Sequence, residues 1–490
     1  MTYDLLIIGG GINGCAIARE AALNGWSVLL VEKDDLASHT SSASTKLIHG
    51  GLRYLETYEF KLVRESLLER RLLMSMAPHL IRPMKFVLPH ENTVRPWWMV
   101  RAGLFLYDLL AGRQNLAPSR RLKKADATFR KPIKEQTSGF VYSDCATDDS
   151  RLTVLNAVDA GRSGAEIRTR TALVLAKRSK DIWTATLSDG SAVKAKALIN
   201  ASGPWVVDVE GMTGRAARNA IKLVKGSHIV VPRLYEGDHA YMLQQPDKRI
   251  VFAINWVNDT TMIGTTEELV DRPGDAQISP AETEYLIAAA NRTFVTQVRD
   301  TDVLFDWSGV RPLFDDGTGD ARTTTRDYVL ELDTDGAPVI AIFGGKITTA
   351  RCLAEEAVEK IGQALGLQFM PATRTRPYPG GDMPDGFDAF LATVKRDWPF
   401  LGDARAARMA RAYGTSLKTM LAGITNEADM GLDFGGGLTR IEVDWLVTNE
   451  WATAVDDILW RRTKIGLVTG DDTRVALEQY LGEGRHAARN

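Results

Sequence analysis

A glycine-rich turn close to the start of the chain constrains the fold more than any other feature. The apolar run 3–8 has the continuous hydrophobicity of a buried parallel strand, and it stops where the glycines begin. Residues 12–23 then have the apolar spacing and alanine-rich composition of a closely packed helix, and residues 27–31 predict a second strand. Strand, glycine turn, helix and strand together predict a βαβ unit, and with it an α/β fold.

The glycines of this turn have the spacing of a dinucleotide-binding fingerprint. Gly9 allows the tight turn, Gly11 lets the backbone approach a pyrophosphate, and Gly14 lets the helix pack closely on the strand. The N-terminus of the helix offers unpaired N–H groups and a partial positive charge to the phosphates. Glu32 follows the second strand, where a carboxylate binds the ribose hydroxyls. The pattern predicts FAD or NAD and disfavours NADP.

Two later segments favour FAD. The apolar strand 197–201 ends in the turn 202–205, which is expected to close over the adenosine side. The segment 343–348 places a second glycine turn before a helix near the far end of the chain. A helix N-terminus directed at the flavin pyrimidine would stabilise the negative charge that reduction places near N1 and O2. A nicotinamide enzyme has no use for this second turn, so the sequence predicts a flavoprotein.

Composition and charge exclude several other classes of protein. A chain of 490 residues predicts two or three domains, and a formal net charge of -2 predicts no nucleic-acid partner. Cys15, Cys145 and Cys352 stand far apart without metal-ligand spacing, so neither a metal site nor a disulfide framework is expected. The N-terminus lacks the features of a signal peptide. The longest apolar stretch, 97–111, is too short to span a bilayer.

The segment Ser41–Leu55 carries the most specific motif of the chain, Lys-Leu-Ile-His-Gly-Gly-Leu-Arg-Tyr. It resembles the signature of the FAD-dependent glycerol-3-phosphate dehydrogenases. The resemblance continues to the C-terminal region through the segments 225–232, 263–266, 308–313, 325–328, 344–346 and 460–464. It implies a glutathione-reductase-like fold, in which a Rossmann-type FAD-binding domain carries an inserted antiparallel β substrate domain and is followed by a helical C-terminal domain.

Local patterns agree with this division of the chain. Residues 61–76 predict an amphipathic helix, and residues 258–259 predict a turn between two strands of an antiparallel sheet. The other expected elements are strands at 221–231, 250–256, 261–264 and 339–343 and a helix at 348–364. The expected boundaries are 1–75, 150–210 and 335–370 for the FAD-binding domain, 76–149 and 211–334 for the substrate domain, 371–384 for a linker and 385–490 for the helical domain.

The resemblance implies oxidation of sn-glycerol 3-phosphate to dihydroxyacetone phosphate, by hydride transfer to N5 of non-covalent FAD, with quinone as the electron acceptor. Bacterial members of the family are typically homodimers on the cytoplasmic face of the inner membrane, so a membrane surface is an expected partner. The nearest alternative is an oxidase that returns the electrons to oxygen and forms hydrogen peroxide. A non-catalytic flavin-binding protein and an amino-acid oxidase are further alternatives, although several cationic residues suit a phosphate dianion better than a carboxylate.

Oxidation of a secondary alcohol on flavin requires a base for the hydroxyl proton and cationic groups that hold the phosphate. His49 is the first choice for the base and His228 the second, because a histidine exchanges protons near neutral pH. The resemblance places Arg311 and Lys346 with His49 in the catalytic centre. It assigns substrate binding to Arg53, Tyr54, His228, Arg311 and Arg326.

The same resemblance assigns a larger set of residues to FAD binding. These residues are Gly9, Gly11, Gly14, Glu32, Ser42, Thr45, Lys46, Gly203, Gly345, Lys346, Ile347 and Thr348.

The segment Val94–Leu110 is the candidate for membrane contact. Arg95 and Arg101 alternate there with tryptophan, tyrosine and aliphatic residues, a combination suited to anionic headgroups above apolar lipid. Lys360 and its helix are a second candidate. The alternative interpretation of Val94–Leu110 is a core helix under the substrate domain, because aromatic residues at helical spacing usually face a core.

Overall fold

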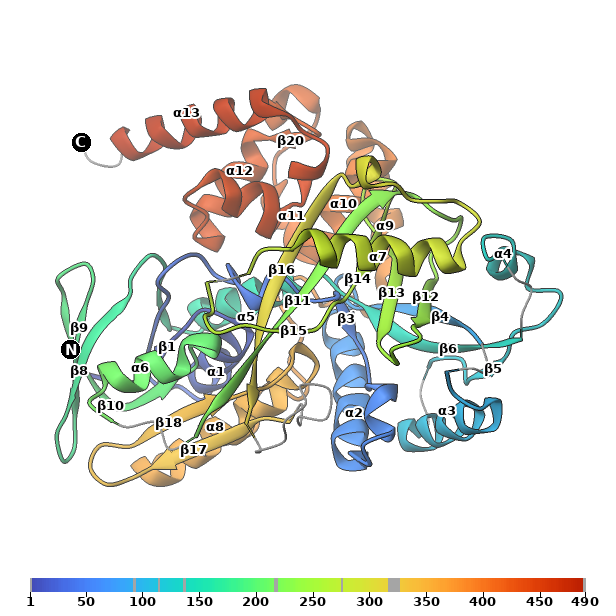
Figure 1. The fold of residues 1–490 in the computed structure, drawn as a ribbon. Helices are drawn as coiled ribbons and strands as arrows, with labels where there is room; N and C mark the ends of the chain where they lie inside the picture. Colours follow the sequence, from blue (N-terminus) through green and yellow to red (C-terminus); the bar gives the residue numbers. More distant parts are fainter. Residues whose placement is uncertain are drawn as a thin grey trace.

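Two large β-sheets and a helical domain form the molecule in the computed structural model (Figure 1). The structure describes residues 2–90, 94–112, 115–134, 138–215, 219–274, 276–315 and 327–487. The first sheet has the strand order β17-β18-β10-β1-β2-β7, with β8 and β9 attached beside β10. Its strands are β1 (Thr2–Ile8), β2 (Val28–Val31), β7 (Glu166–Arg168), β8 (Leu173–Arg178), β9 (Trp183–Leu187), β10 (Ala192–Asn200), β17 (Val329–Asp333) and β18 (Val339–Phe343).

The predicted βαβ unit forms the centre of this sheet. β1 lies parallel to both β10 and β2, and α1 (Ile12–Leu23) connects β1 to β2. Side chains alternate along β1, so that Leu5 and Ile7 enter one buried cluster and Leu6 and Ile8 enter another on the opposite face. The first cluster is covered by α1, α5 (Asp149–Arg162) and α8 (Ala350–Leu365). Burial on both faces explains why the N-terminal run is uniformly apolar.

The second sheet is predominantly antiparallel and corresponds to the predicted substrate domain. Its order is β15-β11-β14-β13-β12-β4-β6-β3, with β16 paired to β11 and β5 to β6. Helix α7 (Pro280–Thr293) packs on one face, while α2 (Phe60–Met76) and α3 (Trp97–Ala111) pack on the other. The strands are β3 (Leu47–Ile48), β4 (Arg82–Pro89), β5 (Arg120–Arg121), β6 (Gly139–Ala146), β11 (Ile221–Pro232), β12 (Ala240–Gln244), β13 (Ile250–Asn255), β14 (Thr260–Gly264), β15 (Glu268–Leu269) and β16 (Phe305–Phe314).

The hairpin predicted at residues 258–259 is confirmed. Asn258 and Asp259 have φ values of 55° and 59°, and β13 and β14 pair in antiparallel register on either side of them. Membership of the two sheets differs from the expected boundaries in two places. β3 lies in the second sheet although it falls within 1–75, and β17 lies in the first sheet although it precedes residue 335. β3 pairs with the distant strand β6, whereas β17 forms an antiparallel hairpin with the next strand, β18.

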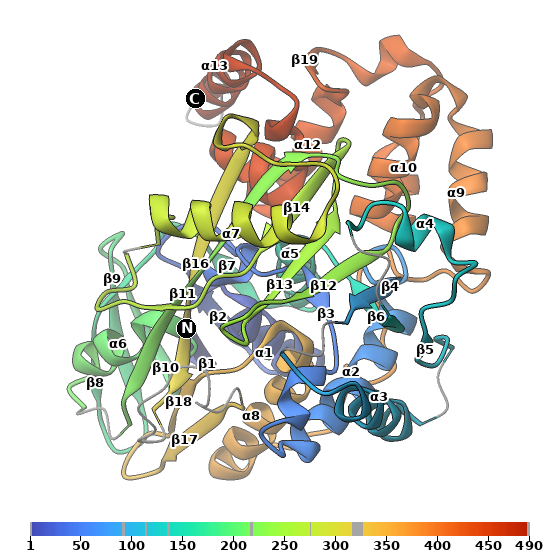
Figure 2. The same cartoon turned by 45° about the vertical axis from the view of Figure 1, so that its right-hand side comes forward.

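The C-terminal region forms a helical domain with its own buried cluster (Figure 2). A short two-stranded sheet, β19 (Asp433–Gly435) with β20 (Leu438–Thr439), interrupts the helices. The helices are α9 (Gly386–Asp397), α10 (Gly402–Tyr413), α11 (Leu417–Met420), α12 (Arg440–Glu450) and α13 (Asp471–Ala487), with a π-helical turn at Asp457–Arg462. Buried ion pairs connect this domain to the first sheet and its helices, among them Arg151–Glu450 and Arg462–Asp35.

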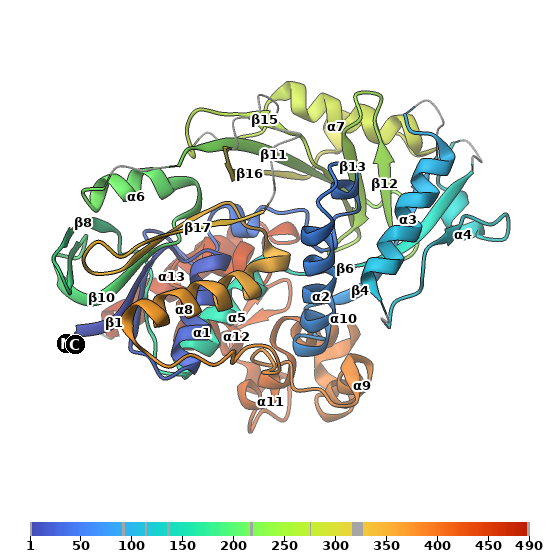
Figure 3. The same cartoon turned by 90° about the horizontal axis from the view of Figure 1, so that it is seen from below.

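Helices α2, α3 and α8 lie side by side on the underside of the molecule (Figure 3). In α3 only Leu104 and Tyr107 are buried, whereas Trp98, Phe105 and Leu109 are 69%, 61% and 65% exposed. The interpretation of this segment as a core helix is therefore wrong: only a narrow stripe faces the sheet. Within the described parts of the chain, no helix combines the length and the hydrophobicity that crossing a bilayer requires.

Replacement of Arg151 by Met should destabilise the protein strongly. The Arg151 guanidinium is buried and donates to Glu450 and to the carbonyl of Ala412, and its removal leaves the buried Glu450 carboxylate with only the longer 3.7 Å pair to Arg462. Loss of one partner of such a pair costs about 3–5 kcal/mol. Thermal unfolding should show a clearly lowered Tm. Replacement of Arg474, whose pair with Asp456 is exposed, is the control and should cost less than about 1 kcal/mol. Equal shifts in the two variants would contradict the interpretation.

Candidate active site

A cavity of about 730 Å³ extends from the carboxyl end of β1 to the face of the second sheet. Its lining at one end comes from the β1–α1 turn, the loop after β2 and the turn after β10. At the other end it is lined by the 3₁₀ turn Leu52–Leu55, the segment after β14, strand β16 and the turn after β18. The cavity therefore joins a nucleotide-binding motif to the surface of the predicted substrate domain.

The glycine fingerprint has the geometry that close approach to a ligand requires. A Cβ atom on Gly14 would lie 2.0 Å from the carbonyl oxygen of Gly9, so only glycine lets α1 cross β1 here. Gly9 has φ 113°, and a Cβ atom on it would meet the carbonyl of Ala201. Gly11 precedes α1 without a side chain and lines the cavity together with Ile12 and Asn13, so the N-terminus of the helix lies at the cavity wall. This arrangement suits a pyrophosphate.

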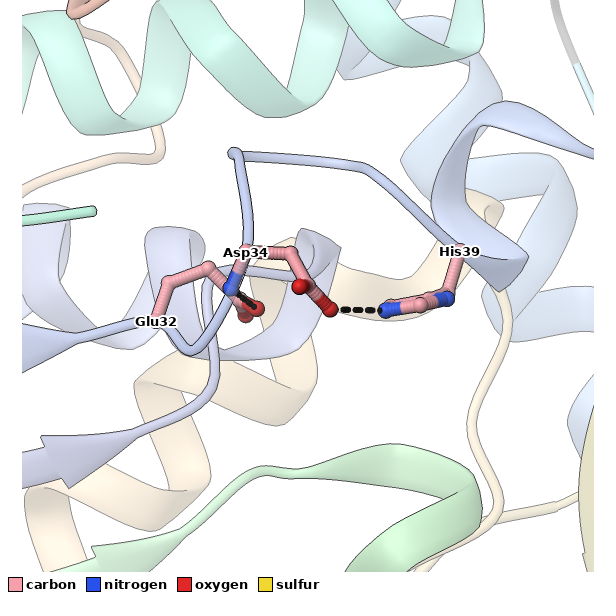
Figure 4. Close-up of side chains that lie close together, drawn as sticks. All are labelled: Glu32, Asp34 and His39. Atoms are coloured by element: carbon pink, nitrogen blue, oxygen red, sulfur yellow. Dashed lines mark hydrogen bonds and ion pairs between the residues drawn. The ribbon is translucent and has the colours of Figure 1, made fainter. Parts of the chain in front are cut away.

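Glu32 lies where the fingerprint places a ribose-binding acid (Figure 4). Its carboxylate accepts the N–H of Gly10 at 2.6 Å and the N–H of Asp34 at 2.8 Å. Burial raises the pKa of Glu32, and these two N–H groups oppose the rise. Asp34 in turn contacts His39 at 2.7 Å. Glu32, Asp34 and His39 lie close enough to hold a cation. Their carboxylate and imidazole groups already make hydrogen bonds within this loop, however, and we assign no metal to them.

The second glycine turn lies opposite the first. Gly344 and Gly345 have φ values of 78° and 94°, and the side-chain amide of Asn13 donates to the carbonyl of Gly344 at 3.4 Å. Lys346 follows, with its Nζ 4.8 Å from the centre of the Tyr54 ring and without a hydrogen-bond partner among the described residues. Burial lowers the pKa of Lys346 to about 8. Ile347 and Thr348 complete this wall and lead into α8.

Two arginines enter the cavity from different elements. Arg53 pairs with Glu267 at 3.2 Å, and Arg311 Nη2 donates to the hydroxyl of Thr265 at 3.4 Å. His49 lines the same region. Burial lowers the pKa of His49 to about 4, partly opposed by the charge of Asp144 and assisted by that of Lys346. The imidazole is therefore neutral near pH 7 and able to accept a proton. Most of the predicted residues thus line one cavity; they are Gly9, Gly11, Glu32, Thr45, His49, Arg53, Tyr54, Gly203, Arg311, Gly345, Lys346, Ile347 and Thr348.

Three predicted residues are placed differently from expectation and do not line the cavity. Lys46 is buried, and its Nζ lies 2.9 Å from Asp149, because the backbone turns the side chain toward α5. The Ser42 hydroxyl donates to the carbonyl of His39. His228 is buried against Trp307, with ring centroids 5.0 Å apart, and burial holds its pKa well below the usual range. Arg326 lies outside the described residues.

Comparisons with known proteins agree with this geometry. Residues 4–351 match the family of FAD dependent oxidoreductases, and residues 371–482 match the C-terminal domain of alpha-glycerophosphate oxidase. The chain is 48% identical over 489 residues to a glycerol-3-phosphate dehydrogenase of Pseudomonas aeruginosa, covering 98% of this chain and 95% of the relative. It is 45% identical over 490 residues to a D-erythritol 1-phosphate dehydrogenase of Brucella abortus, covering 98% of both. The chain belongs to the FAD-dependent glycerol-3-phosphate dehydrogenase family.

A solved structure supports the fold and the cofactor of this family. The glycerol-3-phosphate dehydrogenase of Bacillus halodurans in complex with FAD superimposes with a TM-score of 0.77 at 26% identity, covering 99% of this chain and 90% of that one. FAD is also the cofactor of the present protein. The residues present fit it: the bare glycine turn suits its pyrophosphate, Glu32 its ribose, and the cationic Lys346 region the reduced flavin.

Several residues of this site were not predicted from the sequence. Ser41 accepts the N–H of Ile12 at 2.9 Å and so fixes the first turn of α1, while Asn13 connects the two glycine turns. Thr265 and Glu267 contact the two arginines. Ser41 and Thr265 lie inside segments that carried the family resemblance, which is the signal that could have found them. Glu267 gave no signal beyond its position next to such a segment.

Replacement of Gly14 by Val should abolish FAD binding. The new side chain would occupy the space between α1 and the Gly9 carbonyl, forcing the helix N-terminus away from the cavity. The flavin absorbance per polypeptide measures the effect. Gly103 in α3 has open space around its Cα and is the matched control, so Gly103→Ala should bind FAD fully. Retention of FAD by Gly14→Val would show that the close crossing is dispensable.

The affinity for a phosphate ligand should depend on the ionisation of Lys346. Below pH 8 the ammonium is present and attracts an anion; as the pH rises through about 8 the charge is lost, so the Kd for inorganic phosphate, which does not reduce the flavin, should increase. Titrations that follow the flavin spectrum between pH 6.5 and 9.5 measure this dependence. Lys346→Met should bind more weakly at pH 7 and show no such increase. An identical pH dependence in both proteins would assign it to another group.

Proposed function

We propose that this flavoprotein oxidises sn-glycerol 3-phosphate to dihydroxyacetone phosphate and passes the electrons to quinone. The observation that carries the proposal is the convergence of Arg53, Arg311 and Lys346 on the cavity end that contains the second glycine turn. Cations gathered beside a flavin site suit a substrate with a phosphate dianion at one end. The names of the P. aeruginosa and B. halodurans relatives support the same substrate.

Each side chain has a distinct part in this proposal. Arg53 and Arg311 bind the phosphate and the hydroxyls of the substrate, and Tyr54 orients the substrate beside Lys346. His49 accepts the proton of the secondary hydroxyl, because it lines the substrate end of the cavity and its imidazole is unprotonated at physiological pH. FAD supplies the acceptor of the hydride, at its N5 atom. His228 is not the base in this proposal, since its ring is buried outside the cavity lining and its Nε2 atom lies 3.0 Å from the hydroxyl of Thr45.

A longer polyol phosphate is a second candidate substrate. The D-erythritol 1-phosphate dehydrogenase of B. abortus is as similar to this chain as the glycerol-3-phosphate relatives are. Erythritol 1-phosphate carries the same phosphate on a chain longer by one hydroxylated carbon. Relative kcat/KM for the two compounds decides between the candidates, and a clear preference for the longer one would overturn the glycerol 3-phosphate assignment.

Anaerobic addition of glycerol 3-phosphate should bleach the flavin absorbance, and quinone should restore it faster than oxygen does. Arg53→Ala and Arg311→Ala should each weaken substrate binding by more than tenfold, on the scale of a charge-assisted hydrogen bond of about 1.5–3 kcal/mol, with unchanged FAD content. Arg474→Ala, on the exposed surface of the C-terminal domain, is the control. Wild-type affinity in both arginine variants would make these arginines structural. Faster reoxidation by oxygen would favour the oxidase.

The quinone acceptor motivates a membrane-bound state, which is part of the same proposal. Quinones dissolve in lipid, so the flavoprotein must reach the surface of a bilayer. Helix α3 projects Trp98, Phe105 and Leu109 into solvent, and Arg101 lies on the same helix. We place this helix at the cytoplasmic face of the inner membrane, with Lys360 on α8 as a further contact and a homodimer as the assembly. Figure 3 shows that α3 and α8 share the underside of the molecule.

Wild-type protein should float with anionic liposomes in a density gradient, and Trp98→Glu should remain at the bottom. A charge at this exposed position opposes insertion of the apolar face and leaves the fold intact. Leu432→Glu is the matched control, because Leu432 is an exposed apolar residue of the C-terminal domain, and it should float like the wild type. Flotation of Trp98→Glu with the lipid would exclude α3 as the contact.

A further inference from the structure

The segment that follows β14 presents alternate residues to opposite sides of the second sheet. Thr265 and Glu267 point into the cavity, where they contact Arg311 and Arg53. Thr266 and Glu268 point to the other side, where Thr266 donates to Glu282 at 2.5 Å and Glu268 pairs with Lys225 at 3.2 Å. This alternation is that of an extended chain. It places the carboxylate of Glu267 at the substrate end of the cavity and the carboxylate of Glu268 on the opposite side of the sheet.

A carboxylate at this place does not serve phosphate recognition. The Glu267 side chain is 9% exposed and lies 3.2 Å from Arg53, whose side chain is 28% exposed. A phosphate dianion beside it would meet a like charge and would share Arg53 with it. The carboxylate must therefore face a part of the substrate that carries no negative charge.

The hydroxyl end of a polyol phosphate is such a part. Its O–H groups are donors, and an ionised carboxylate is the strongest acceptor that a side chain offers them. The geometry points to Glu267 as a specificity-determining residue of this site: it accepts a hydrogen bond from a hydroxyl of the polyol end, while Arg53 holds the carboxylate in place. This inference rests on the proposed function, since it takes the substrate to be a polyol phosphate.

The same carboxylate would make the site reject a second negative group. A substrate that carries a carboxylate in place of the terminal hydroxymethyl group would lie against Glu267, and Arg53 cannot neutralise two carboxylates at once. The pair of Arg53 and Glu267 would thus distinguish a polyol phosphate from a phosphorylated hydroxy acid of the same length. Two compounds isolate the two effects. Propane-1,2-diol 1-phosphate is glycerol 3-phosphate without its terminal hydroxyl, and 3-phosphoglycerate has a carboxylate at that carbon.

The first experiment combines the loss of the substrate hydroxyl with the loss of its acceptor. In the wild type, kcat/KM should fall by more than about tenfold from glycerol 3-phosphate to propane-1,2-diol 1-phosphate, the scale of a hydrogen bond to a charged group. In Glu267→Met, which has a similar volume and accepts no such bond, the ratio should shrink to less than about threefold. Glu268→Gln is the matched control, since Glu268 points away from the cavity, and it should keep the wild-type ratio.

The second experiment tests the charge and uses Glu267→Gln, which preserves the shape of the side chain. The variant should bind 3-phosphoglycerate at least about tenfold more tightly than the wild type, measured as competition against flavin reduction by glycerol 3-phosphate. A wild-type ratio of kcat/KM in Glu267→Met, or unchanged binding of 3-phosphoglycerate in Glu267→Gln, would overturn the inference. A uniform loss for every ligand would overturn it too, because Glu267 would then only position Arg53. Failure of the wild type to be reduced by glycerol 3-phosphate would instead refute the proposed function.

Discussion

The contact between Gly9 and Gly14 is the constraint on which the rest of the molecule depends. With no side chain on Gly14, α1 crosses directly over the end of β1, and its N-terminus lies at the carboxyl end of this central strand. That position lets Asn13 reach the carbonyl of Gly344 and so brings two turns together that are more than three hundred residues apart in sequence. The cavity exists between these two turns because the helix is held so close to the strand.

Several buried cationic side chains elsewhere in the interior are held in ion pairs, whereas Lys346 in the cavity forms none with the described residues. Buried arginines elsewhere lie in dense ion pairs; Arg351, for example, contacts both Glu69 and Glu355. Such pairs leave little charge for a ligand and hold α8 and α2 together. In the cavity, Lys346 has no hydrogen-bond partner among the described residues and its pKa is lowered, so its proton is weakly held. A group in this state responds strongly to an incoming anion, which is what a binding site requires.

Local signals in the sequence predicted the first βαβ unit, the hairpin at Asn258 and Asp259 and the two glycine turns, whereas the resemblance to a family predicted most of the other cavity residues. These features succeed because each is decided by a few neighbouring residues: a glycine spacing, an apolar run or a turn pair. Lys46 and His228 were misplaced for the opposite reason. Both lie next to true cavity residues, but the direction of each side chain depends on a distant partner, Asp149 for Lys46 and Trp307 for His228. The sheet to which β3 belongs is likewise decided by a distant partner, β6.

The strand order of the first sheet also determines when the protein can assemble during its synthesis. β1 is made first, yet one of its neighbours is β10, at residues 192–200, and the partner of β10 on the other side is β18, at residues 339–343. β2 and α1 follow β1 directly, but the other edge of β1 stays unpaired until β10 has left the ribosome, and pairing between strands so distant in sequence is slow. The ion pair of Asp35 forms later still, because its partner Arg462 lies near the end of the chain. A nascent chain of this protein thus carries an unpaired strand edge, open to non-native pairing, until β10 and then β18 have been made.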